Sequence, residues 1–141
     1  MNISLGLKIT DPDLFIPWNI NTKQLKTVFE GHDIKYVTDT YYTIGCEMFN
    51  SLNCILGFHF QHTTFDRILE FEFFRTNYSE QEKSFDEFQF YFVQEFGPPT
   101  NIKKGNEGFN NYEWLLDDIK IIHLVYNRFG SEEHMRIIKY Q

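Results

Sequence analysis

The sequence has no apolar run long enough to span a membrane, and it has only two cysteines. A bilayer-spanning helix needs about 20 apolar residues, so no membrane partner is expected. The opening residues MNISLGLKITDPD lack the basic segment and apolar block of a secretion signal, and this predicts a cytoplasmic protein. In a reducing compartment, Cys46 and Cys54 are expected to be buried apolar residues, with a disulfide as the less favoured alternative.

Clusters of lysine and arginine are also missing. The chain carries 20 acidic and 13 basic residues, which gives a formal net charge of -7. Phosphate backbones bind positively charged surfaces, so nucleic acid is not an expected partner. An acidic globule is better suited to a basic protein.

Motifs of catalytic, nucleotide-binding and metal-binding sites are absent as well. There is no G-x-S-x-G, no Walker loop and no G-x-G-x-x-G. His59 and His62 form an H-x-x-H, but residues three apart on a strand point to opposite faces. We therefore expect no catalytic residue, no cofactor and no metal ion.

Aromatic residues are abundant, with 16 Phe, 8 Tyr and 2 Trp. The segment SFDEFQFYFVQEF is predicted to be a helix that begins at Ser79 or Ser84 and ends at Gly97, where Pro98 and Pro99 follow. Its apolar residues recur at the three-and-four spacing of one helical face. The residues expected on this inward face are Phe85, Phe88, Phe92, Val93 and Phe96.

Alternating apolar residues predict strands in the rest of the chain. A short helix over 23–30 and three strands over 42–48, 54–60 and 69–73 precede the aromatic helix. Three strands over 111–116, 119–129 and 132–140 follow it. Helix, loop and three strands thus occur twice, at about 21–75 and 80–140, after an N-terminal strand and apolar segment in residues 1–20.

This pattern predicts one domain over 1–141 of the α+β class. We expect an antiparallel sheet with two helices on one face, built as two α-β-β-β units. The strand over 119–129 is apolar on both sides, because Ile122, Leu124 and Tyr126 lie opposite the inward set. Either the segment Phe15 to Trp18 covers that second face, or a partner does, which leaves a homodimer open.

Two carboxylates, Glu70 and Glu72, are expected side by side on one strand face. Such pairs serve acid/base hydrolysis, although a row of glutamates is also typical of the wet face of any half-exposed strand. His123, on an apolar strand, is expected to be a hydrogen-bonded core residue.

The stretches Phe96-Gly97-Pro98-Pro99 and Tyr112-Glu113-Trp114 resemble the helix, Gly-x-Pro and Trp-strand arrangement of two families. These are the small outer-membrane assembly lipoproteins and the tandem-repeat β-lactamase inhibitor proteins. The resemblance covers about half of the chain and implies a surface that binds proteins. In size, acidity and lack of catalytic motifs, the chain also resembles the bacterial immunity proteins that neutralise secreted toxins.

These features predict a non-catalytic acidic binding protein, an immunity protein that occludes the active site of a basic toxin such as a nuclease. The alternative is a small-molecule-binding or catalytic domain with a pocket between sheet and helices, attended by His59, Glu70, Glu72 or His123. Exposed aromatic residues rimmed by acids are typical of interfaces. The expected partner-binding residues are Glu70, Glu72, Phe74, Asp86, Glu87, Phe90, Asp117 and Asp118.

Overall fold

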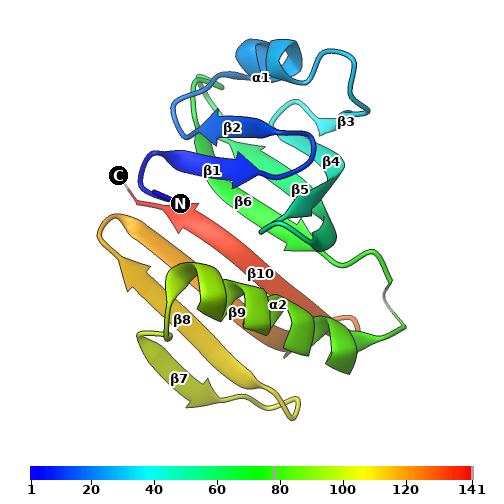
Figure 1. Ribbon diagram of the computed structural model, residues 1–141, viewed down its shortest axis with the longest axis vertical. Coiled ribbons are helices and arrows are strands. Elements are labelled where there is room, and N and C mark those ends of the chain that lie inside the picture. Colours follow the sequence, from blue (N-terminus) through cyan, green and yellow to red (C-terminus); the bar gives the residue numbers. More distant parts are fainter. Residues whose placement is uncertain (78, 141) are drawn as a thin grey trace.

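The computed structural model describes residues 1–77 and 79–140, and within them it has two helices and two antiparallel sheets (Figure 1). The fold is therefore α+β, as predicted, and most of it is sheet. A two-stranded sheet pairs β1 (Gly6–Ile9) with β2 (Leu14–Pro17). The main sheet has eight strands in the order β3-β4-β5-β6-β10-β9-β8-β7.

Each half of the main sheet follows one helix in the chain. After α1 (Thr22–Val28) come β3 (Lys35–Thr38), β4 (Tyr41–Met48), β5 (Leu52–Phe60) and β6 (Ile68–Phe74). After α2 (Gln81–Phe96) come β7 (Asn101–Lys104), β8 (Asn110–Leu116), β9 (Ile119–Asn127) and β10 (Ser131–Lys139). The last strands of the two halves, β6 and β10, pair antiparallel and join the halves at one seam.

The prediction of three strands in each unit is wrong, because each half has four. The additional strands β3 and β7 form the two edges of the sheet, and all of their residues are exposed. With neither face buried, they carry no alternating apolar pattern from which a strand could be predicted.

The helix ends follow local chemistry in part. Asn21 caps α1, since its side chain accepts a hydrogen bond from the Gln24 N–H and the Gln24 side chain accepts one from the Asn21 N–H. The predicted start of α2 at Ser79 or Ser84 is wrong: the helix begins at Gln81, Glu80 precedes it without a side-chain cap, and the Ser84 hydroxyl donates to Glu133. Gly97 ends α2 as predicted, with φ 81°.

The core lies on one face of the main sheet, called the inner face, which carries Leu56, Phe58, Phe71, Phe73 and Trp114. Phe29, just after α1, packs on Phe58, and Phe92 of α2 packs on both Phe73 and Trp114. Each buried ring contributes roughly 1.5–3 kcal/mol of hydrophobic free energy. Val93 departs from the predicted inward set, because it is exposed.

The β1–β2 hairpin lies over the inner face, in front of the sheet in Figure 1. Trp18 packs on Phe71 with ring centroids 4.5 Å apart and donates its indole N–H to the carbonyl of Ile3. The alternative that Phe15 to Trp18 covers the opposite face is therefore wrong. Neither of the two helices in the described residues has the length and apolar composition needed to cross a membrane.

Candidate functional site

An ion-pair network lies at the centre of the opposite face of the main sheet, called the outer face. His59 of β5 stands directly across from Glu70 of β6, and Arg136 of β10 stands across from Glu72. The Arg136 guanidinium contacts the carboxylates of Glu70 and Glu72 at 2.8 and 2.9 Å. Nε2 of His59 lies 2.8 Å from the Glu72 carboxylate. The network therefore spans the seam between the two halves.

The ring of Tyr41 partly covers this network. Tyr41 stacks on His59 at 4.3 Å and also covers Gly57, where an added Cβ would lie 2.8 Å from the tyrosine ring. Burial raises the pKa of Glu70, while the positive charges of Arg136 and His59 oppose that rise. Since Glu72 is only 8% exposed and both carboxylates are paired, this part of the outer face offers little free negative charge.

The same cluster contains a set of atoms that could hold a metal ion. Nε2 of His59 and carboxylate oxygens of Glu70 and Glu72 lie within 4.8 Å of one another. The Arg136 guanidinium already lies against both carboxylates, so a cation could bind them only by displacing it. The arrangement fits a structural ion-pair network better than a metal site.

Apolar side chains also lie on the outer face, along β8, β9 and β10, among charged ones such as Glu113 and Lys120. Tyr126 and Leu115 are 56% and 47% exposed, and Ile122, Leu124 and Ile138 are half-buried. Phe74 of β6, across from Ile55, is also half-buried there. These side chains form an apolar strip beside the ion-pair network.

A second exposed group lies on α2 and is called the helix patch: Asp86, Glu87, Phe90 and Val93. Residues three and four apart are neighbours on a helix surface, so both acids and Val93 adjoin the Phe90 ring. Phe90 is 56% exposed. Among the described residues, none forms an ion pair or hydrogen bond with Asp86 or Glu87, so their charges face solvent.

The eight predicted partner-binding residues do not form one surface. Glu70, Glu72 and Phe74 lie on the outer face, and Asp86, Glu87 and Phe90 lie on α2. Asp117 and Asp118 form the predicted two-residue turn between β8 and β9, where Asp118 pairs with Lys139 at 2.8 Å. The helix patch is the one of these groups that combines an exposed ring with free acids.

His123 is a hydrogen-bonded core residue, as predicted. It is fully buried on the inner face, stacks on Phe85 and contacts Glu133 and Gln89 at 2.7 and 2.8 Å. Burial lowers the pKa of His123, and the Glu133 carboxylate opposes that shift. Glu133 also faces Arg75 at 3.5 Å, so the cluster fixes α2 to the sheet.

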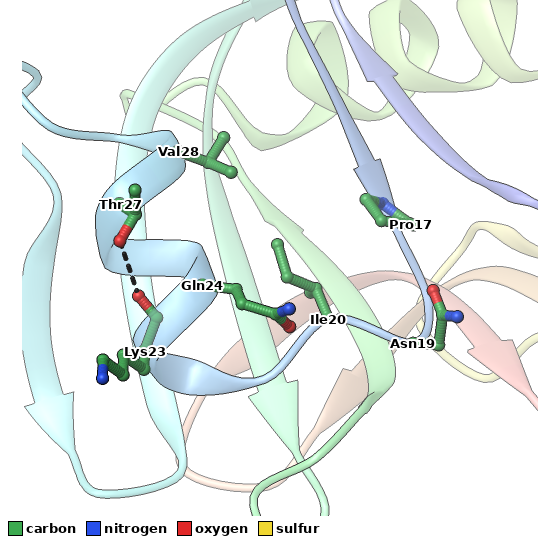
Figure 2. A pocket seen from close by; sticks show the side chains of 7 residues that line it. All are labelled: Pro17, Asn19, Ile20, Lys23, Gln24, Thr27 and Val28. Carbon is green, nitrogen blue, oxygen red and sulfur yellow. Dashed lines mark hydrogen bonds between the residues drawn. The ribbon is translucent and has the colours of Figure 1, made fainter.

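The hollows of the surface contain few of the predicted polar residues: Glu72 lines one of about 310 Å³ with Phe74, His134 and Arg136, but neither His59 nor Glu70 lines it. Figure 2 shows one of about 710 Å³ between α1 and the end of β2, into which Ile20 and Gln24 point. Its lining residues are Pro17, Asn19, Ile20, Lys23, Gln24, Thr27 and Val28. This lining holds neither a carboxylate nor a histidine, and it offers no acid/base pair.

Arg136 and Tyr41 complete the outer-face network, and neither is among the predicted site residues. The alternation of β10 could have placed Arg136 on the outer face, but nothing in the sequence indicates that β10 adjoins β6. In comparisons with protein-family models, curated proteins and solved structures, the chain matches none of them.

Proposed function

We propose that this chain is a non-catalytic binding protein that occludes a basic protein. Its specific form would be a cytoplasmic immunity protein that neutralises a basic toxin, such as a nuclease. The observation that carries the proposal is the helix patch, where the exposed Phe90 ring adjoins the free carboxylates of Asp86 and Glu87. An aromatic residue with charged neighbours is typical of binding hot spots.

The proposal includes the position of the helices. We infer that both cover the inner face, since Phe29 after α1 contacts Phe58 while Phe88 and Phe92 of α2 contact Phe73. Phe58 and Phe73 share that face through their strand register. The opposite side of α2 then points away from the sheet and can receive a partner.

The proposed mechanism is occlusion guided by charge. The carboxylates of the helix patch take the place of the phosphates that a nuclease expects, and the net charge of -7 accelerates encounter with a basic partner. Charge steering raises association rates by about 10 to 1,000-fold. Burial of Phe90 then slows dissociation, because an aromatic side chain buries about 150–250 Å².

The test uses the product of the adjacent gene as the candidate toxin. The purified chain should retain that product in a pull-down and protect cells that express it. The double variant Asp86→Lys and Glu87→Lys should lose both effects, and Phe90→Ala should weaken binding at least tenfold, about 1.4 kcal/mol.

Matched controls separate local contact from total charge. Glu30→Lys with Asp33→Lys makes the same change of charge at exposed positions beyond α1 and should retain most of the binding. If Leu124→Glu abolishes binding while the variants of Asp86, Glu87 and Phe90 still bind, the interface lies on the outer face. Failure of the chain to retain the product or protect cells would refute the proposed function.

The alternative of a small-molecule-binding or catalytic domain has less support. It expects a pocket between sheet and helices attended by His59, Glu70, Glu72 or His123, but the first three lie on the outer face, and His123 is fully buried in the core. In addition, the carboxylates of Glu70 and Glu72 are held by Arg136.

A homodimer is a second candidate, favoured by the apolar strip of the outer face. Tyr126 and Leu115 are exposed there, and the charges beside them are paired within the chain, as in Glu113 with Lys120 at 3.0 Å. Because these charges are paired within each chain, two copies could join these faces without strong repulsion. Light scattering should then give twice the monomer mass, and Leu124→Glu should restore the monomer.

A further inference from the structure

The two cysteines of the chain lie directly across from each other on neighbouring strands. Cys46 of β4 and Cys54 of β5 are partners in the antiparallel register. Opposed residues of such a pair have Cα atoms about 4.5 or 5.5 Å apart. Disulfides need about 4.4–6.8 Å, so either kind of pair meets this requirement. The two thiols are in hydrogen-bonding contact, and both are free.

We propose that Cys46 and Cys54 form a reversible redox site, closed to a cross-strand disulfide by a small disulfide oxidant such as glutathione disulfide. The Cys46 thiolate attacks one sulfur of the oxidant, which forms a mixed disulfide and releases one glutathione thiolate. The Cys54 thiolate then attacks the Cys46 sulfur and releases the second glutathione. Two thiols of the protein are oxidised, and one glutathione disulfide is reduced to two glutathione molecules.

The surroundings of the two sulfurs set the order of these steps. Cys54 is 1% exposed, while Cys46 is only partly buried, so the oxidant can reach Cys46 first. The hydrogen bond with Cys46, followed by burial, raises the pKa of Cys54. Cys54 therefore remains a thiol until the mixed disulfide forms beside it.

The sheet geometry favours a bond that reopens easily. Opposed Cβ atoms on antiparallel strands lie about 4.5–5.5 Å apart, whereas a relaxed disulfide has about 3.5–4.5 Å. The strands must approach each other to close the bond, and a strained disulfide is more readily reduced. Such a bond is suited to responding to the redox state of its surroundings.

The hairpin that holds the two cysteines also contacts α2. Phe49, in the turn between β4 and β5, packs against Tyr91, Phe92 and Phe96, and the Ser51 hydroxyl bonds that of Tyr91. A disulfide across this hairpin therefore restricts the β4–β5 turn, which packs against α2, the helix that carries the helix patch. The redox site itself does not depend on the proposed binding function.

Intact mass spectrometry of the folded chain tests the proposal. Incubation of the reduced protein with glutathione disulfide should yield a monomer that has lost two hydrogen atoms and carries no glutathione. After denaturation of the oxidised protein, alkylation should detect no free thiol. Treatment with excess reduced glutathione should restore the thiols of Cys46 and Cys54. A stable glutathione adduct, a disulfide-linked dimer, two persistent thiols or failure to reopen would overturn the proposal.

Single variants test the roles of the two sulfurs. In the Cys54→Ser variant, the reaction with glutathione disulfide should stop at a mixed disulfide with one glutathione on Cys46, because the thiol that would displace the glutathione is missing. Cys46→Ser should remain unmodified while folded, because Cys54 is buried. The opposite pattern would overturn the assigned order. Circular dichroism checks the fold of each variant, and the wild-type mass measurement decides the main question without any variant.

Discussion

The Glu133 carboxylate holds together the buried cluster beneath α2. It contacts His123 at 2.7 Å, Ser84 at 2.8 Å and Arg75 at 3.5 Å, and its side chain is 2% exposed. Glu133→Gln keeps the shape but removes the charge, so we expect a loss of about 2–3 kcal/mol in the free energy of unfolding. The neighbouring Glu132→Gln should change it by less than about 0.5 kcal/mol, because that side chain is exposed. Equal losses in urea titrations would contradict this account.

His123 should make the stability of the chain depend on pH. Its pKa in the folded protein lies below the ordinary value of 6.5, so below pH 6.5 the unfolded chain takes up a proton that the folded chain does not. The free energy of unfolding should therefore fall as the pH drops below about 6.5, and level off below the folded-state pKa. His134, whose pKa is also lowered, acts in the same direction.

Paired measurements isolate the contribution of His123. The variant His123→Gln should be less stable at pH 7.5, yet its stability should change less between pH 7.5 and 5.5 than that of the wild type. His134→Gln serves as the comparison, since it removes a second titrating group that lies on the other face. An unchanged slope in His123→Gln would contradict the direction of the shift.

The end of α2 depends on a backbone conformation that only glycine adopts readily. Gly97 has φ 81° and ψ -168°, and its carbonyl accepts the indole N–H of Trp114 at 2.8 Å. Gly97→Ala should therefore cost about 2 kcal/mol of stability. Gly45→Ala is the matched control, because Gly45 has an ordinary φ and no atom lies close to where its Cβ would be. This variant should leave the stability unchanged or slightly higher. Thermal denaturation of the two variants compares the positions directly.

The strands that bury one face could be predicted from the sequence, and the edge strands could not. β5 alternates visibly because Cys54, Leu56 and Phe58 enter the core, whereas β3 and β7 bury nothing. Edge pairing depends on the backbone of a neighbouring strand, which a local pattern does not describe. The end of α2 at Gly97 could be predicted, because it depends on local chemistry alone.

The candidate site was predictable only where one element forms it. The exposure of Phe90 beside Asp86 and Glu87 follows from helical spacing within α2. The pairing of Glu70 and Glu72 with Arg136 joins residues far apart in the chain, and it depends on β6 and β10 meeting at the seam. Strand order of this kind is a tertiary property, so two carboxylates expected to bind a partner are instead paired with Arg136 within the chain.

One apolar core extends across the seam of the molecule. Buried residues of both halves belong to one cluster, in which Phe73 of β6 contacts Phe88 and Phe92 of α2. The seam itself joins only the backbones from Met135 to Ile138 with those from Glu70 to Phe73. We therefore expect much of the coupling between the halves to come from side-chain packing, so that neither half keeps its core when the other unfolds.

The two tryptophans report on this coupling, because Trp18 packs on Phe71 in the first half and Trp114 packs on Phe92 in the second. Trp114→Phe leaves the first reporter and Trp18→Phe leaves the second. In each variant, the fluorescence transition in denaturant should coincide with the transition in far-ultraviolet circular dichroism, as expected for one cooperative domain of this size. If the halves were independent, each reporter would follow only its own half while circular dichroism showed two steps. Such a separation would mean that the packing of Phe73 against α2 is too weak to bind the halves into one folding unit.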